Sequence, residues 1–215
     1  MGETPLERVV ECGVIAIVRL RFTASLIEVA NAIRSGGIDV IEVSLTTPEA
    51  LDMLREGVRE LGDDVLFGAG TVLDAETARA AILAGARFIV TPTLAKETIA
   101  ICKRYGVVSI PGALSPTEIL TAWESGADLV KVFPATVGGP RYIRDVLAPL
   151  PQVKLVPTGG IELANAAAFI RAGATALGVS SSLVDPEAVR CGDFGALTKV
   201  AQAFQEAVSA ARTHE

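Results

Sequence analysis

The most informative segment of this chain is Leu129-Val130-Lys131-Val132-Phe133-Pro134. Its apolar residues predict a buried β-strand, and one lysine lies in the middle of that strand. Lysine is rarely buried without a partner, so packing alone gives little reason for Lys131. A buried amine can act as a nucleophile on a carbonyl carbon and form a Schiff base. The alternative is a lysine at the strand's end that pairs with a nearby carboxylate.

Strand-like runs of the same kind occur on both sides of this stretch, and helix-like stretches separate them. This alternation is typical of a parallel sheet that is covered by helices. The predicted strands are Val14–Val18, Val40–Ser44, Val65–Gly68, Phe88–Thr91, Val108–Ile110, Leu129–Phe133, Lys154–Pro157 and Ala176–Val179. Eight such units predict an α/β fold, a (β/α)₈ TIM barrel that forms a single domain over residues 1–215.

The junctions between the predicted elements favour the barrel. Four helices are expected to end at a glycine just before a strand, because glycine adopts the left-handed conformation that closes a helix. Thr47-Pro48 and Ser115-Pro116 predict helix starts at the opposite face. The alternative is an open doubly wound sheet, which needs a glycine-rich loop where this chain has Arg19-Leu20-Arg21-Phe22. The four glycines are Gly36, Gly85, Gly126 and Gly173.

Composition excludes several classes of function. The net charge of the 215 residues is −6 and the basic residues are scattered, which argues against nucleic acid and anionic membranes as partners. No apolar run reaches membrane-spanning length and the N-terminus lacks a signal-peptide pattern, so a cytoplasmic protein is expected. Cys12, Cys102 and Cys191 are expected to be buried thiols, not disulfides or zinc ligands.

Histidine chemistry is also excluded as a basis for function. The only histidine is His214, next to the C-terminus. Ser-His-Asp hydrolysis, Cys-His hydrolysis and a histidine-ligated zinc site are therefore not expected. We predict that the chain uses lysine, carboxylates, hydroxyls and backbone groups, with no metal and no cofactor.

Polar residues follow the predicted strands at their carboxyl ends, where barrels hold their active sites. Because side chains alternate along a strand, Glu42 and Lys131 are both expected to point into the barrel. A carboxylate beside a Schiff-base lysine can move protons on the substrate, whereas the alternative is a buried ion pair. Arg19 ends the first strand, where it can clamp a carboxylate or remain a solvated surface arginine. Thr71 and Pro92 are expected at the mouth of the barrel.

Two loops of small residues follow the seventh and eighth strands. They are Thr158-Gly159-Gly160-Ile161 and Gly178-Val179-Ser180-Ser181-Ser182. Barrels often bind phosphate with these two loops, through backbone N–H groups and a short extra helix. We expect such a site here, with Ser181–Val184 as the extra helix.

Several motifs of the chain, in one order, together resemble the 2-keto-3-deoxy-6-phosphogluconate (KDPG) aldolase family. The resemblance runs from about Gly13 to Ala211. It implies a metal-free class I aldolase with a TIM-barrel fold, usually a homotrimer, that splits a phosphorylated 2-keto-3-deoxy sugar acid into pyruvate and glyceraldehyde 3-phosphate. The motifs are Glu42-Val43-Ser44-Leu45, Gly68–Val72, Pro111-Gly112 with Ser115–Glu118, Lys131–Ala135 and Val156–Ile161.

The resemblance assigns roles by position in these motifs. Lys131 matches the Schiff-base lysine of the family and Glu42 matches its acid/base. The pocket residues around the pyruvyl group are matched by Thr71, Pro92 and Phe133. The residues that match the phosphate end are Gly159, Gly160 and Ser181.

Two positions depart from the family pattern. Thr46 stands where many members carry an arginine that binds the substrate carboxylate, and Ser180 replaces a glycine before the phosphate-site serine. We predict that Arg19 supplies the carboxylate contact and that Thr46 adds a weaker hydrogen bond. This arrangement would fit a preference shifted toward 2-dehydro-3-deoxy-6-phosphogalactonate or 4-hydroxy-2-oxoglutarate.

Two alternatives use the same barrel without a covalent step. One is a barrel isomerase or synthase with the same phosphate loops, and the other is a catalytically silent protein that binds a phosphorylated metabolite. Both predict that Lys131 never becomes covalently attached to a ligand.

Overall fold

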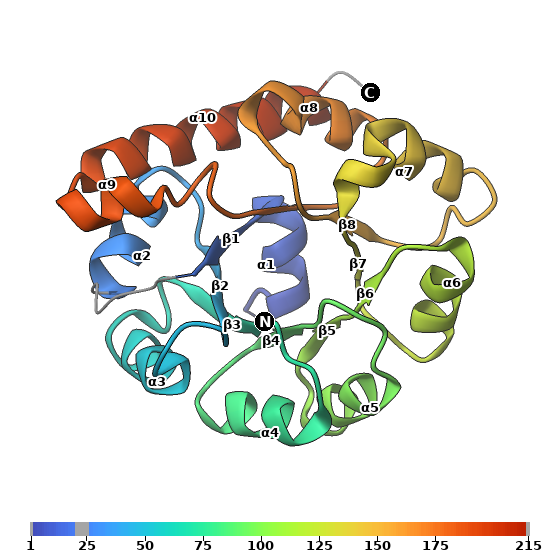
Figure 1. Ribbon diagram of the computed structural model, residues 1–215, viewed down its shortest axis with the longest axis horizontal. Helices are drawn as coiled ribbons and strands as arrows, with labels where there is room; N and C mark the ends of the chain where they lie inside the picture. The colour runs from blue at the N-terminus through green and yellow to red at the C-terminus, as the bar shows by residue number, and fades with distance from the viewer. Residues whose placement is uncertain (1, 20–25, 214–215) are drawn as a thin grey trace.

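The computed structural model describes residues 2–19 and 26–213. Helices surround a curled parallel sheet, as Figure 1 shows. Two predictions concern residues outside the described ranges. One is the exclusion of histidine chemistry, which concerns His214, and the other is the lack of a glycine-rich loop at Leu20-Arg21-Phe22.

The strands of the described residues pair in parallel, in two hydrogen-bonded parts. One part has the order β5-β4-β3-β2-β1-β9 and the other the order β6-β7-β8. A single bridge joins Thr158, after β8, to Gly178 of β9. The strands are β1 (Val14–Val18), β2 (Val40–Ser44), β3 (Leu66–Gly70), β4 (Phe88–Val90), β5 (Val108–Ile110), β6 (Gly112–Ala113), β7 (Val130–Val132), β8 (Leu155–Pro157) and β9 (Leu177–Val179).

All eight predicted strands are present, with bounds that differ by no more than two residues. β6 was not predicted. Pro111 separates it from β5, because proline has no N–H group to donate to a neighbouring strand. The pairing confirms an α/β fold with a curled parallel sheet, and closure into a full (β/α)₈ barrel stays a prediction.

The helices lie between the strands along the chain, and α8 and α10 pack side by side (Figure 1). A 3₁₀ turn, η1 (Ala135–Val137), follows β7. The helices are α1 (Pro5–Cys12), α2 (Leu26–Ser35), α3 (Ala50–Leu61), α4 (Ala75–Leu83), α5 (Lys96–Tyr105), α6 (Pro116–Glu124), α7 (Gly139–Leu147), α8 (Leu163–Arg171), α9 (Pro186–Cys191) and α10 (Phe194–Arg212).

The predicted glycine-ended helices are confirmed. α2, α4, α6 and α8 each end one or two residues before the predicted glycine. The left-handed residue is the predicted glycine in three of them, whereas after α2 it is the next one, Gly37, with φ 93°. In each case a residue after the helix donates its N–H to a carbonyl five residues earlier, as Ala86 does to Ala81.

The predicted helix start at Ser115 is confirmed, and the one at Thr47 is wrong. The Ser115 hydroxyl accepts the N–H of Glu118, and the Glu118 carboxylate accepts the N–H of Ser115. Thr47 instead donates its N–H to the carbonyl of Ser44 and forms a turn. α3 therefore begins at Ala50, two residues after the predicted first residue Pro48.

The predicted short helix at Ser181–Val184 is also wrong. The N–H groups of Leu183 and Val184 donate to the carbonyl of Ser180, which makes a single turn. Pro186 restricts Asp185 to an extended conformation, so the turn cannot continue as a helix. The next helix, α9, begins at Pro186.

The core consists of the strands and the helix faces that cover them. Cys12 and Cys102 are buried in it as predicted, but Cys191 is exposed. The buried residue of α9 is Val189. Cys191 lies two positions further along the helix, so its side chain points about 200° away from Val189, toward solvent. Among the described helices, none is both long enough and apolar enough to cross a membrane.

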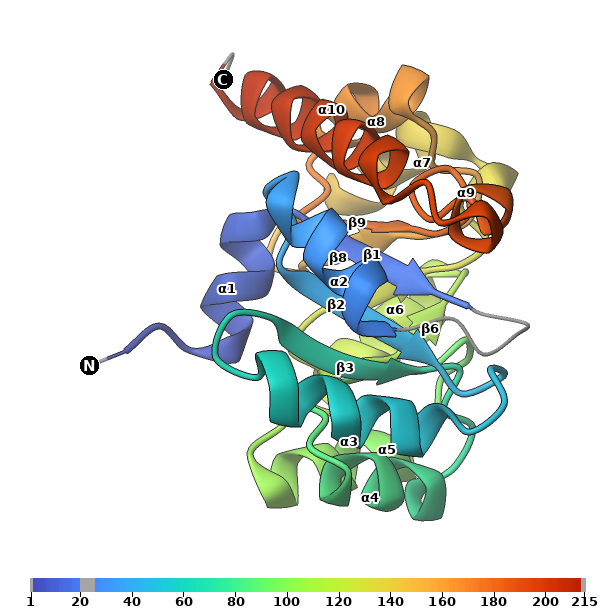
Figure 2. The same cartoon turned by 90° about the vertical axis from the view of Figure 1, so that its left-hand side faces the viewer.

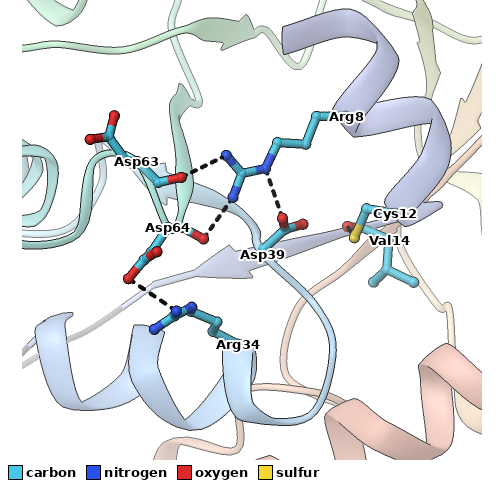
Figure 3. A network of polar contacts seen from close by, with 7 residues as sticks. All are labelled: Arg8, Cys12, Val14, Arg34, Asp39, Asp63 and Asp64. Atoms are coloured by element: carbon cyan, nitrogen blue, oxygen red, sulfur yellow. Dashed lines mark hydrogen bonds and ion pairs between the residues drawn. The ribbon is translucent and has the colours of Figure 1, made fainter. Parts of the chain in front are cut away.

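α1 covers the end of the sheet where the strands begin, opposite the arrowhead of β1 (Figure 2). Arg8 of α1 donates from Nε to the Asp39 carboxylate at 2.7 Å. The same guanidinium donates to the backbone carbonyls of Asp63 and Asp64, at 3.2 and 2.6 Å (Figure 3). Arg212 of α10 donates to the carbonyl of Glu11 at 2.7 Å. Two arginines therefore join α1 to the segments around it.

We predict that Arg8→Ala lowers the free energy of unfolding by about 1–3 kcal/mol, because one half-buried guanidinium makes three hydrogen bonds that water only partly replaces. Urea denaturation followed by circular dichroism measures the loss. Arg55→Ala is the control, since it removes an exposed pair with Asp52 within α3, and a much smaller loss is expected. Equal losses in both variants would show that Arg8 is an ordinary surface residue.

Candidate active site

Glu42 lies in the middle of β2 and is 2% exposed. A Cβ atom placed on Gly70 would lie 1.7 Å from Glu42 Oε1, so the carboxylate rests against the backbone of β3. Burial raises the pKa of Glu42 above its ordinary value of 4.5, and the positive charges of Lys131 and Arg19 oppose the rise. Glu42 can therefore hold a proton at a pH where an exposed carboxyl group has lost it.

Lys131 lies in the middle of β7 and is 6% exposed. Its Nζ is 5.1 Å from the centroid of the Phe133 ring, which is 39% exposed. Among the charges that lower the pKa of Glu42, that of Lys131 has the largest effect. The structure thus brings the two predicted residues close enough for the lysine charge to act on the carboxyl group, although they are far apart in the sequence.

Three hydroxyl groups form a cluster at the carboxyl ends of β2 and β3. Ser44 Oγ lies 2.9 Å from Thr46 Oγ1 and 3.0 Å from Thr71 Oγ1. Thr71 has φ 59°, a left-handed conformation that is rare for a β-branched residue. The parallel register explains the cluster, because it pairs Ser44 with Gly70, the residue before Thr71.

Pro92 follows β4 and is half-buried beside the start of β6. A Cβ atom on Gly112 would lie 2.4 Å from the Pro92 carbonyl carbon, so the two backbones are in direct contact. The Thr91 hydroxyl accepts the N–H of Gly112 at 3.2 Å. Pro92 is therefore held rigidly at a strand end, as predicted.

Arg19 is exposed and is the last described residue before the gap that begins at residue 20. Its charge lowers the pKa of Glu42, although less than the charge of Lys131 does. Thr46 is exposed, and the hydrogen bond to Ser44 holds its side chain at the mouth.

A small hollow of about 100 Å³ lies between the loops after β8 and β9. Ser182 Oγ donates to the carbonyl of Ile161 at 2.6 Å and so ties the two loops together. The Asn165 amide donates to the carbonyl of Gly160 and accepts the N–H of Glu162, both at 2.9 Å. The hollow is lined by Gly159, Gly160, Ile161, Glu162, Gly178, Ser180, Ser181 and Ser182.

Thr158 is the one predicted site residue of this region that does not line the hollow. Its hydroxyl points back to the carbonyl of Val156 at 3.4 Å. A Cβ atom on Gly178 would lie 2.2 Å from Thr158 Oγ1, so the side chain fills the space beside β9. The side chain therefore packs beside β9, and its predicted contact with a substrate stays a prediction.

The sequence interpretation missed several residues that shape the site. Gly70 leaves the space for the Glu42 carboxylate, Ser44 links two mouth threonines, and Glu162 is one of the residues that line the hollow. The spacing of Glu42 and Ser44, two residues apart on one strand, places them on the same face and was the available signal for Ser44. In the residues that the structure describes, no cluster of three His, Cys, Asp or Glu side chains could hold a metal ion.

Comparison with known proteins assigns the chain to a family. A family model described as "KDPG and KHG aldolase" matches residues 6–200. The chain belongs to the KDPG/KHG aldolase family. It is therefore an aldolase, an enzyme that makes and breaks carbon–carbon bonds, which confirms the resemblance drawn from the motifs.

Individual relatives agree with this assignment. This aldolase is 38% identical to a 2-dehydro-3-deoxy-phosphogluconate aldolase of Treponema pallidum (strain Nichols), over 92% of each chain. It is 36% identical to a 2-dehydro-3-deoxy-6-phosphogalactonate aldolase of Escherichia coli (strain K12), over 71% of this chain and 75% of that one. A structure of the Legionella pneumophila KDPG aldolase, with pyruvate captured as a covalent carbinolamine, has a TM-score of 0.85 at 28% identity, over 94% of this chain and 98% of that one.

We predict that Gly70→Ala lowers kcat about 100-fold or more, because the added methyl group overlaps the carboxylate of Glu42, the residue that we predict to transfer protons. Pyruvate release in a coupled assay measures kcat. Gly68→Ala on the same strand is the matched control. Its methyl group meets the Phe88 ring at 2.4 Å, so it should lower stability and leave the folded enzyme active. Full activity in Gly70→Ala would show that Glu42 does not depend on this space.

Proposed function

We propose that this aldolase cleaves 2-dehydro-3-deoxy-6-phosphogluconate to pyruvate and glyceraldehyde 3-phosphate through a Schiff base on Lys131. The observation that carries the proposal is the burial of both Lys131 and Glu42, with the lysine charge acting on the carboxyl group and lowering its pKa. The named activity of the Treponema pallidum relative supports the substrate. The captured carbinolamine of the Legionella pneumophila enzyme supports a covalent route.

The reaction begins when the Lys131 amine attacks the C2 ketone of the substrate, and loss of water then gives an imine. Glu42 takes the proton of the C4 hydroxyl as the C3–C4 bond breaks. The electron pair of that bond moves into the imine, which becomes an enamine as the aldehyde leaves. Protonation of the enamine carbon and hydrolysis release pyruvate and restore the amine.

The two ends of the substrate are assigned to different loops. At the phosphate end, Gly159, Gly160 and Ser181 offer backbone N–H groups and a hydroxyl, and the tie between Ser182 and Ile161 supports both loops. At the pyruvyl end, Arg19 supplies the charge for the carboxylate and Thr46 a weaker hydrogen bond. The other pyruvyl contacts are Thr71, Pro92 and Phe133.

The second candidate is the same reaction on 2-dehydro-3-deoxy-6-phosphogalactonate or on 4-hydroxy-2-oxoglutarate. It is supported by the 36% identity to the Escherichia coli phosphogalactonate aldolase. Thr46 favours it as well, because a threonine leaves more room at the mouth than an arginine does.

We also propose a closed (β/α)₈ barrel, a homotrimer and a cytoplasmic location. The bridge between Thr158 and Gly178 supports closure on one side. On the other side, the hydrogen bond from Lys131 N–H to the Pro111 carbonyl, at 2.9 Å, joins β7 to the segment that leaves β5. Exposed apolar side chains at Leu73, Leu83 and Val137 support an association between subunits.

We predict that pyruvate and borohydride together modify Lys131, because a ketone condenses with the buried amine and hydride then reduces the imine. Peptide mass mapping identifies the modified residue. Lys154, exposed just before β8, is the internal control and should remain unmodified. An adduct on another lysine, or none at all, would contradict the Schiff-base mechanism on Lys131.

We predict that Glu42→Gln lowers kcat by about 10²- to 10⁴-fold, the range for a lost general acid/base. Glu42 must be unprotonated to accept the C4 proton, so cleavage by the wild-type enzyme should fall with decreasing pH through the Glu42 pKa. Because burial raises this pKa, the fall should occur at a pH above 4.5, and it should be absent in the variant.

Steady-state cleavage between pH 4.5 and 8 measures both effects. Glu76→Gln, at an exposed position of α4, is the control and should behave as the wild type. A Glu42→Gln enzyme with near wild-type turnover would show that Glu42 serves only as a counter-charge for Lys131.

A further inference from the structure

Ser44 ends β2, two residues after Glu42 and on the same face, and it is fully buried. Its hydroxyl is within hydrogen-bond distance of two others, Thr46 Oγ1 at 2.9 Å and Thr71 Oγ1 at 3.0 Å. Thr46 follows β2, whereas Thr71 follows β3. Ser44 thus links two mouth residues that come from different strands.

The number of protons in this cluster limits what it can offer a ligand. Three hydroxyls carry three protons, and two hydrogen bonds among them use two. Ser44 can donate its proton to one threonine and accept a proton from the other. The threonine that receives the Ser44 hydrogen bond then keeps its own proton for a ligand. A carboxylate can only accept hydrogen bonds, so the cluster offers it one donor. The direction of the Ser44 hydroxyl decides whether Thr46 or Thr71 provides it.

The backbone of Thr71 gives independent support. Its φ of 59° is unfavourable for a β-branched residue, and glycine or asparagine would adopt it more easily. The backbone conformation of the turn therefore does not explain why position 71 is a threonine. Such an outlier at the mouth of a catalytic cavity points to a functional side chain. Here the hydroxyl contributes the contact to Ser44.

We propose that Ser44 is a positioning residue, which holds Thr46 and Thr71 so that the one free O–H of the cluster points toward the carboxylate of the bound 2-keto acid. Arg19 provides the charge that attracts this carboxylate, and the hydroxyl cluster sets its direction relative to Lys131. The inference rests on the proposed function, because it assumes that a 2-keto acid binds in the cavity.

The test is the concentration of pyruvate that gives half-maximal borohydride trapping on Lys131. In Ser44→Ala this concentration should rise about three- to tenfold, the effect of a lost neutral hydrogen bond. The maximal extent of trapping should be retained, because the amine itself is unchanged. Ser44→Cys keeps the size of the side chain but is a poor hydrogen-bond donor, and it should show a similar rise.

Methyl pyruvate is the matched ligand, since its neutral ester is a weaker acceptor than a carboxylate. Its half-maximal concentration should change less than twofold in both Ser44 variants. Ser109→Ala is the control variant. Ser109 is also a buried strand serine, but its hydroxyl bonds to Asp128 outside the cavity, and its loss should not alter trapping by pyruvate.

A wild-type response to pyruvate in Ser44→Ala would overturn the inference. So would recovery of pyruvate affinity in Ser44→Cys, or an equal shift for pyruvate and its methyl ester, because packing would then be the cause. Failure of the proposed function gives a different result, namely that the wild-type protein forms no adduct on Lys131.

Discussion

The site depends on two ionisable side chains, Glu42 and Lys131, that are buried among apolar strands. Removing a charge from water costs several kcal/mol, and an opposite charge nearby offsets part of that cost. The effect is visible at Glu42, whose pKa is raised by burial and lowered again by the charge of Lys131. The pair has room because Gly70 carries no side chain where the carboxylate lies. Removing either charge would leave the other buried without its partner.

The contacts that stabilise the fold and the residues of the proposed site lie at different places along the strands. α1 covers the end where the strands begin, and Arg8 joins it to Asp39 and to two backbone carbonyls (Figure 3). The carboxyl ends of the parallel strands lie at the other edge, where each strand can contribute a side chain to one cavity. The two proposed catalytic side chains lie in the middle of β2 and β7, and the loops after β8 and β9 form a separate hollow.

The sequence interpretation was wrong where contacts with neighbouring residues, and not the local pattern, set the backbone conformation. Thr47 has the pattern of a helix start, but its N–H bonds to Ser44 and the helix begins at Ala50. Ser181–Val184 forms one turn, because Pro186 constrains the residue before it. β6 was missed, since two residues after a proline carry no periodic pattern of their own. The burial of Glu42 and Lys131 within strands was foreseen, because a charged residue in an apolar run is visible in the sequence itself.

By itself, the sequence determined the parallel α/β arrangement, the strand positions and the pair Glu42 and Lys131, because period-two patterns, glycine helix ends and a lysine among apolar residues are local signals. Its ordered motifs also resembled the KDPG aldolase family, and residues 6–200 match that family. Tertiary structure alone decided that Gly70 makes room for Glu42, that Ser44 links Thr46 to Thr71, and that Thr158 lies outside the hollow. These are contacts between neighbouring strands and loops, and they depend on strand register and on distances of a few ångströms that no single segment encodes.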